Sequence, residues 1–224
     1  GRAPACAAAR GRGGLPSRLS LPAAAKSDLA QVVEFELERL VPLGREEIYY
    51  DFVVREVGAK LEVQVISLPR RVVAEITGAL EDAGVRARSV AVTPLAILDY
   101  VRFCDLGETA PVAVLRHEGA DVELDLVSQR ALAATHVLRP AEVATMPAVS
   151  RLVAREVAAA GASAESLEIF GLTDENAGVE TPFPPELGES GRELLRRAAS
   201  RLTAPEGFFD TASPALVPAL GAGL

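Results

Sequence analysis

The chain is poor in aromatic residues, since its 224 residues include no tryptophan, three tyrosines and seven phenylalanines. Apolar residues nevertheless make up 49% of the sequence, so a sizeable core is expected and must be built from alanine, leucine and valine. Proteins that bind single-stranded nucleic acid stack its bases on aromatic side chains. The composition therefore argues against that class of binding protein.

Cysteine is also scarce, with only Cys6 and Cys104 in the chain. Two cysteines make neither a disulfide framework nor a cysteine zinc site, which favours a reducing compartment. Charged residues interrupt every apolar run before it reaches the length of a membrane-spanning helix. Because the chain has neither an initiator methionine nor a segment of signal-peptide type, we interpret it as a fragment of a longer protein.

The net charge of −8 opposes binding to a phosphate backbone, and no nucleic-acid partner is expected. The charge is uneven, because the first twenty residues hold four arginines and no acid. Residues 1–14 are rich in alanine, glycine and arginine and show no apolar period. They are predicted to be a disordered tail, since such a tract buries too little to offset its backbone entropy.

Residues 15–92 alternate between strand and helix patterns and form the first expected domain. Pro42 should end the first helix, Gly58 and Ala59 should form a tight hairpin, and Gly84 should end the second helix. The order is β-α-β-β-α-β, which predicts a ferredoxin-like subdomain. The expected strands are 18–21, 48–57, 60–67 and 86–92, with helices from Asp28 and from Pro69.

One apolar cluster is expected between the helices and the sheet of this subdomain, because apolar residues recur at helical spacing in the helices and alternate in the strand. Its expected members are Leu29, Val33, Leu37, Val63, Val65, Val73, Ile76 and Leu80.

Residues 93–224 form the second expected domain. Thr93 and Pro94 should begin a helix, and three strands, a helix and a further strand should follow. Ser190 and Glu193 have the spacing of a capping box, which predicts a helix start there. This order predicts part of an actin-like, ribonuclease H-like unit, so the whole chain is expected to be α+β (α/β). The expected strands are 111–116, 121–127, 131–138 and 167–172, with a helix from Pro147 and a short last helix after Pro214.

Glycines mark the two places where this unit would contact a nucleotide. Gly119 lies in the turn between the first two strands, where backbone amides would face a phosphate, and Gly171 lies where a nucleoside would approach. Glu118 and Asp121 beside Gly119 would repel a phosphate unless they held Mg²⁺. Gly119 and Gly171 are therefore interpreted as a vestigial nucleotide site. His117 and His136 are interpreted as surface residues near turns, and a two-histidine metal site as the alternative.

The segment LSLPAAAKSDLAQVVEFELERLVPLGREEIYYDFVV, residues 19–54, resembles a family of bacterial envelope machines. Leu21-Pro22, Glu36, Val41-Pro42 and Tyr50-Asp51 have the spacing found in type IV pilus assembly protein M and in the cytoplasmic domain of type II secretion protein L. Residues 63–101 are similar to the next passage of these actin-like proteins. The resemblance extends over about residues 18–224 and fades after residue 140.

The departures from this family concern its nucleotide site. Members that bind ATP carry a first phosphate hairpin in a subdomain that would precede residue 18, the hairpin at Gly119 lacks their Asp-Gly pattern, and the turn at Gly171 lacks a double glycine. The resemblance thus implies the secretion protein L branch, a cytoplasmic domain that precedes a transmembrane helix and docks the secretion ATPase. It implies a place on the cytoplasmic side of the bacterial inner membrane, with membrane attachment only through a segment outside this chain.

Two functions of different classes remain open at this stage. The first is a noncatalytic scaffold of a type II secretion or type IV pilus platform, with protein partners that include the secretion ATPase, with a possible homodimer, and without a cofactor. Eight acids and one arginine lie between Glu165 and Glu193, and the acidic stretch around Asp174 to Glu189 would be a partner surface or simply a solvated loop. The second is an ATP- and Mg²⁺-binding actin-like ATPase. A free-standing ferredoxin-like regulatory module would leave residues 93–224 unexplained.

Overall fold

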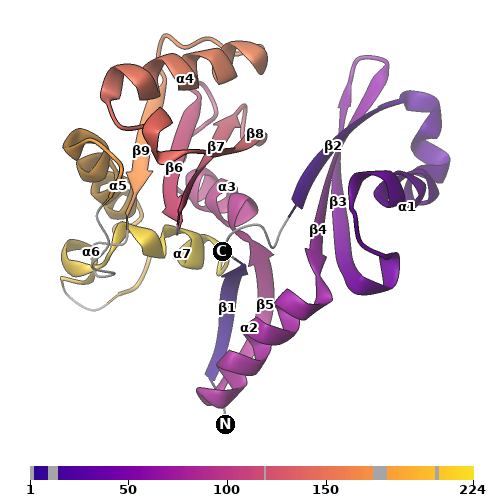
Figure 1. Ribbon diagram of the computed structural model, residues 1–224, viewed down its shortest axis with the longest axis horizontal. Helices are drawn as coiled ribbons and strands as arrows, with labels where there is room; N and C mark the ends of the chain where they lie inside the picture. Colours follow the sequence, from indigo (N-terminus) through magenta and orange to yellow (C-terminus); the bar gives the residue numbers. More distant parts are fainter. Residues whose placement is uncertain (1–2, 10–14, 119, 174–180, 205–206) are drawn as a thin grey trace. The chain divides into compact units, whose positions relative to one another are not determined.

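The computed structural model describes residues 3–9, 15–118, 120–173, 181–204 and 207–224. The chain divides into two compact units, Gly1–Thr93 and Pro94–Leu224. Both units mix helices and strands, which confirms the expected α+β class (Figure 1).

A three-stranded antiparallel sheet forms the larger part of the first unit. Its strand order is β2-β4-β3, so the central strand is β4 and the other two are edge strands. Helix α1 begins at Leu29, one residue after the expected start at Asp28, and ends before Pro42 as expected. The strands are β2 (Leu15–Pro22), β3 (Ile48–Val57) and β4 (Lys60–Pro69), and the helices are η2 (Ala23–Asp28), α1 (Leu29–Leu40) and η3 (Arg45–Glu47).

The turn between β3 and β4 is the expected two-residue hairpin. Val57 pairs with Lys60, and Gly58 between them has φ +59°. A glycine at the first position of such a turn takes this left-handed conformation at no steric cost. The hairpin fixes the register of β3 against β4 over their whole length.

The apolar cluster of this sheet lies under α1 and is smaller than the sequence indicates. Val33 and Leu37 of α1 pack on the alternate residues Leu61, Val63 and Val65 of β4, and Leu29 packs at the margin. The predicted inclusion of Val73, Ile76 and Leu80 is wrong, because these residues of α2 (Arg70–Asp82) are only half-buried and lie outside the cluster. Periodicity identified the apolar face of α2, but it carries no information about which sheet that face contacts.

Helix α2 packs instead on a second sheet, which is parallel and two-stranded. β1 (Ala3–Ala9) pairs with β5 (Val85–Val92), and α2 (Arg70–Asp82) packs beside both strands. Gly84 after α2 has φ +75°, as expected for a residue that ends a helix. The last strand of the expected ferredoxin-like sheet therefore pairs outside that sheet, although the order of helices and strands is the predicted one.

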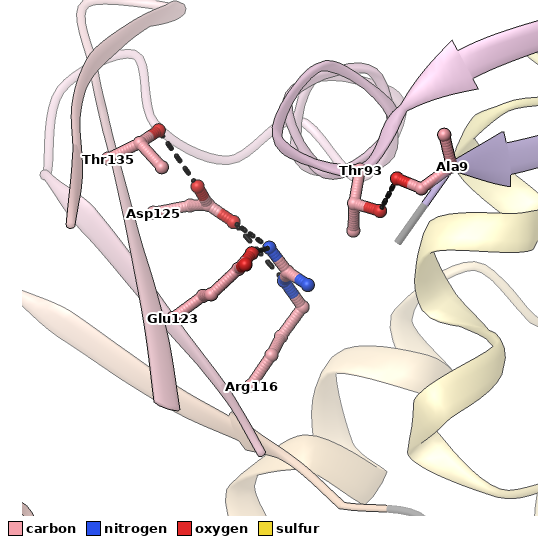
Figure 2. Close-up of polar contacts among 6 residues, drawn as sticks. All are labelled: Ala9, Thr93, Arg116, Glu123, Asp125 and Thr135. Carbon is pink, nitrogen blue, oxygen red and sulfur yellow. Dashed lines mark hydrogen bonds and ion pairs between the residues drawn. The ribbon is translucent and has the colours of Figure 1, made fainter. Parts of the chain in front are cut away.

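The predicted disorder of residues 1–14 is wrong for residues 3–9, and residues 1–2 and 10–14 lie outside the described residues. An alanine strand has no apolar period, but β5 satisfies its backbone through a parallel ladder. The hydroxyl of Thr93 also donates a hydrogen bond of 2.5 Å to the carbonyl oxygen of Ala9 (Figure 2). Backbone hydrogen bonds thus order a segment whose side-chain pattern predicts neither a helix nor a strand.

A four-stranded sheet of order β8-β7-β6-β9 forms the centre of the second unit. The first three strands are antiparallel, and β9 lies parallel to β6. This arrangement agrees with the expected part of an actin-like unit. The strands are β6 (Val112–Glu118), β7 (Asp121–Ser128), β8 (Ala131–Leu138) and β9 (Glu168–Leu172).

Helices cover both faces of this sheet and bury two aliphatic clusters (Figure 1). One face packs on α3 and α7, and the other packs on α4. Helix α5 contributes to both, with Leu187 in one cluster and Leu194 and Leu195 in the other. The helices are α3 (Thr93–Phe103), η4 (Pro140–Glu142), α4 (Met146–Ala159), α5 (Pro185–Arg197), α6 (Phe208–Thr211), η5 (Pro214–Leu216) and α7 (Val217–Gly221).

Among the residues that the structure describes, none of the helices has both the length and the apolar character needed to cross a membrane.

Candidate functional site

The expected phosphate hairpin lies between β6 and β7. Gly119 itself is outside the described residues, so its role stays a prediction. The two strands pair with Glu118 opposite Asp121 and Arg116 opposite Glu123. This register places Arg116 and Glu123 side by side on neighbouring strands, close to the turn.

A buried ionic cluster crosses the sheet just behind this turn (Figure 2). The guanidinium of Arg116 donates to the carboxylates of Glu123 and Asp125, with its Nη2 atom 3.1 Å from Oδ2 of Asp125. The other oxygen of Asp125 accepts a 2.9 Å hydrogen bond from the hydroxyl of Thr135 on β8. Asp125 is fully buried, and Arg116 and Glu123 are nearly so.

Two effects oppose each other at Asp125. Burial raises the pKa of its carboxyl group above the ordinary value of 3.8, while Arg116 and the hydroxyl of Thr135 lower it. Burial dominates, so the carboxylate form of Asp125 is costly here even with Arg116 in place. The ion pairs of Arg116 and the hydrogen bond from Thr135 therefore link β6, β7 and β8 at one point.

Gly171, the second expected nucleotide contact, is buried in β9 against α5. A Cβ atom on Gly171 would lie 2.6 Å from Cγ of Leu187, so the helix occupies the space that a side chain would need. The amide of Gly171 donates to the hydroxyl of Ser190, and that hydroxyl donates to the carbonyl of Leu187. Packing of α5 on β9 accounts for this glycine, and its nucleotide role stays a prediction.

The capping box predicted at Ser190 is wrong. Helix α5 begins earlier, at Pro185, and Ser190 lies inside it. Proline fits the first turn of a helix because its fixed φ suits that position and its missing N–H needs no partner there. The Pro184-Pro185 pair was the true start signal, and Ser190 joins helix and strand instead.

The two histidines lie near separate partners. Nε2 of His136 is 2.8 Å from a carboxylate oxygen of Glu156, and the side chain of His136 is exposed. The ring of His117 packs edge-on against Phe183, with 6.4 Å between ring centroids. Within the described ranges, no three histidine, cysteine, aspartate or glutamate side chains gather as a metal site would require.

A different site appears in the first unit, where a pocket of about 400 Å³ opens at the start of β3. Arginine and tyrosine dominate its lining, and both are enriched among residues that carry binding energy at protein interfaces. It is lined by Arg45, Glu46, Ile48, Tyr49, Tyr50 and Arg70.

Each arginine of this pocket lies over a tyrosine ring. The guanidinium carbon of Arg70 lies 4.1 Å from the ring centroid of Tyr49, and that of Arg45 lies 6.0 Å from the centroid of Tyr50. Tyr49 is 50% exposed, and it is one of three tyrosines in the chain. No motif in the sequence predicts this site, and its one signal there is that two of the chain's three tyrosines stand together near Arg45.

Comparisons with known proteins give a structural match only. No family model matches the sequence, and no curated protein matches it. Among solved structures, the PilM-PilN type IV pilus biogenesis complex matches with a TM-score of 0.56 and 16% identity, over 94% of this chain and 75% of that one.

Two further structures were matched at lower similarity. The cytoplasmic domain of EpsL, an inner membrane component of the Vibrio cholerae type II secretion system, has a TM-score of 0.49 and 15% identity, over 85% of this chain and 72% of that chain. A Bacteroides thetaiotaomicron protein with an actin-like ATPase fold has a TM-score of 0.38 and 8% identity, over 71% and 58% of the two chains. The first match is the one that carries weight, and it shows that this chain has the fold of the pilus protein that the sequence resembles.

Proposed function

We propose that the chain is a noncatalytic scaffold of a type IV pilus or type II secretion platform and acts by docking partner proteins. The fold shared with a protein of a PilM-PilN complex supports this proposal, since that complex joins two proteins. Fold alone is a weak warrant for function, and two sites on the chain give further support.

The buried cluster behind the β6–β7 turn carries the proposal. Phosphoryl transfer needs a carboxylate that holds a metal ion and backbone donors that face the phosphates. At this hairpin, Glu123 and Asp125 are directed at Arg116 and are buried with it. Both carboxylates are thus engaged by Arg116 across the sheet, which supports a structural role for them.

The pocket at the start of β3 supports the docking part of the proposal. Its exposed tyrosine and the arginine stacked on that ring are residue types that make energetic anchors in protein interfaces. The partners proposed for this scaffold are platform proteins, including the secretion ATPase, with a second copy of the chain as a further partner. The platform would place it at the cytoplasmic side of the bacterial inner membrane, attached through a segment outside this chain.

Deletion of the gene in its bacterial host tests this function. We expect the deletion strain to lose surface pili or type II secretion, and the wild-type gene to restore them. The Gly119→Val and Asp121→Asn variants should restore piliation or secretion as well as the wild-type gene does, because no nucleotide chemistry is required. Unchanged piliation and secretion after deletion would refute the scaffold. Failure of both variants to complement, at normal protein levels, would favour the ATP-binding ATPase instead.

A further inference from the structure

The edge of β3 has outward-facing backbone groups along a ten-residue strand. A two-residue hairpin makes Val57 and Lys60 a hydrogen-bonded pair, so alternate residues of β3 bond to β4 and the others face outward. The amide of Phe52 confirms this phase, because it donates to the side chain of Asp51 over 2.8 Å. Ile48, Tyr50, Phe52 and Val54 therefore direct their backbone groups away from the sheet.

The arginines of the pocket flank this edge on both sides. Tyr49 and Tyr50 are consecutive in a strand, so their rings lie on opposite faces of the sheet. Arg70 stacks on Tyr49 on one face, and Arg45 lies over Tyr50 on the other. A strand added to β3 would therefore have guanidinium groups beside its side chains on both faces.

These two arginines differ in their partners. Arg45 forms an ion pair with Glu34 of α1. Arg70 forms no ion pair within the part of the chain that the structure describes, and the ring of Tyr49 holds its guanidinium plane. A stacked guanidinium keeps its N–H groups at its rim, where a carboxylate can accept two parallel hydrogen bonds. Arg70 is thus the group of the pocket suited to an anionic ligand.

We propose that the β3 edge binds an extended acidic segment of a partner protein, with one carboxylate of that segment on Arg70. The segment adds as a fourth strand, through main-chain hydrogen bonds to the outward groups at Ile48 and Tyr50. Its alternate side chains meet the Tyr49 face, where Arg70 selects an acid. This inference rests on the proposed docking function and names the chemistry of its ligand.

Asp51 has a defined part in this recognition. Its carboxylate covers the outward amide of Phe52, which an added strand would otherwise use. Charged side chains on an edge strand protect it against unselective pairing. Short segments that reach only Ile48 and Tyr50 therefore bind beside Asp51 without displacing it.

Synthetic peptides test the proposal on the whole chain. The probe is Thr-Thr-Val-Glu-Val-Thr-Thr, compared with the same peptide carrying Gln in place of Glu and with a Glu peptide whose backbone nitrogens are methylated. Binding is measured by titration and followed by the amide NMR signals of β3. We expect the Glu peptide to bind roughly tenfold more tightly than the Gln peptide, and the methylated peptide not to bind.

Matched variants identify the arginine involved. Arg70→Gln should bind the Glu and Gln peptides equally, while Arg71→Gln, at the exposed neighbouring position of α2, should keep the preference of the wild type. Equal binding of the two peptides to the wild type, a preference that survives in Arg70→Gln, or no β3 signal change at millimolar peptide would overturn the proposal. These results are independent of pilus and secretion phenotypes, so loss of this inference leaves the scaffold function to its own test.

Discussion

Gly191 of α5 lies so close to Gly171 of β9 that a Cβ atom on Gly191 would be 1.9 Å from the carbonyl oxygen of Gly171. No rotation of a side chain relieves such an overlap, because the obstacle is backbone. The two glycines therefore allow a helix and a strand to approach more closely than any other residue pair at these positions would.

Gly191→Ala should destabilise the second unit by about 1 to 3 kcal/mol or more, since the added methyl group forces α5 away from β9. The control is Gly188→Ala in the same helix, where nothing lies within 4 Å of the added atom. That variant should be as stable as the wild type or more stable by up to about 1 kcal/mol, because alanine favours the helix. Urea unfolding measures both. Equal stability of the two variants would mean that α5 is not packed on β9 in this way.

Leu37→Ala should lower the free energy of unfolding of the first unit by about 2 to 5 kcal/mol. Leu37 is 3% exposed and packs from α1 onto the central strand, β4. Phe35→Ala on the same helix is the control, because Phe35 is 65% exposed and its loss should cost little. Denaturant melts compare the two, and a cost below about half a kcal/mol for Leu37→Ala would show that α1 is misplaced.

Asp125→Asn tests the buried cluster through its pH dependence. Burial raises the native pKa of Asp125 above 3.8, so the native state binds a proton more readily than the unfolded state does. The penalty for the charged form is present above the native pKa and disappears as the pH falls towards 3.8. Relative to Asp125→Asn, the wild type should therefore gain stability on going from pH 7 towards pH 4. Urea melts across this range measure the difference, and a relative loss by the wild type would contradict the assignment.

The thiol of Cys104 should react slowly with alkylating agents in the native protein. Burial raises its pKa to about 11, although Arg201 and Arg197 act in the opposite direction. At pH 8 the reactive thiolate should then be more than about a hundredfold scarcer than in the unfolded chain. Iodoacetamide labelling of a Cys6→Ala variant, native and in urea, gives the ratio. Similar rates in both conditions would show that this thiol is accessible and ionised.

Local signals in the sequence predict the local structure well. Gly58 predicts the β3–β4 hairpin and Gly84 predicts the end of α2, and both glycines have positive φ. Long-range pairing is less accessible, because β1 is an alanine strand whose partner, β5, is distant in sequence. The same reason explains why the apolar face of α2 was assigned to the wrong sheet.

The candidate sites depended even more on long-range contacts. Arg116 and Glu123 stand at equal distances from the expected turn, so counting outward from that turn pairs them, but their burial follows only from the folded unit. Arg45 and Arg70 are separated by a whole hairpin, and only the register of β3 brings them to one pocket. Contacts between residues of one segment could be predicted from the sequence, and sites assembled from several segments could not.

Calorimetric titration of the chain with ATP and Mg²⁺ tests the central claim most directly. A noncatalytic scaffold should give no binding heat up to millimolar ATP, because Glu123 and Asp125 are paired with Arg116 and Gly171 is covered by α5. Binding in the micromolar range that disappears in Gly119→Val would contradict the account and identify the chain as an ATP-binding member of the actin-like fold.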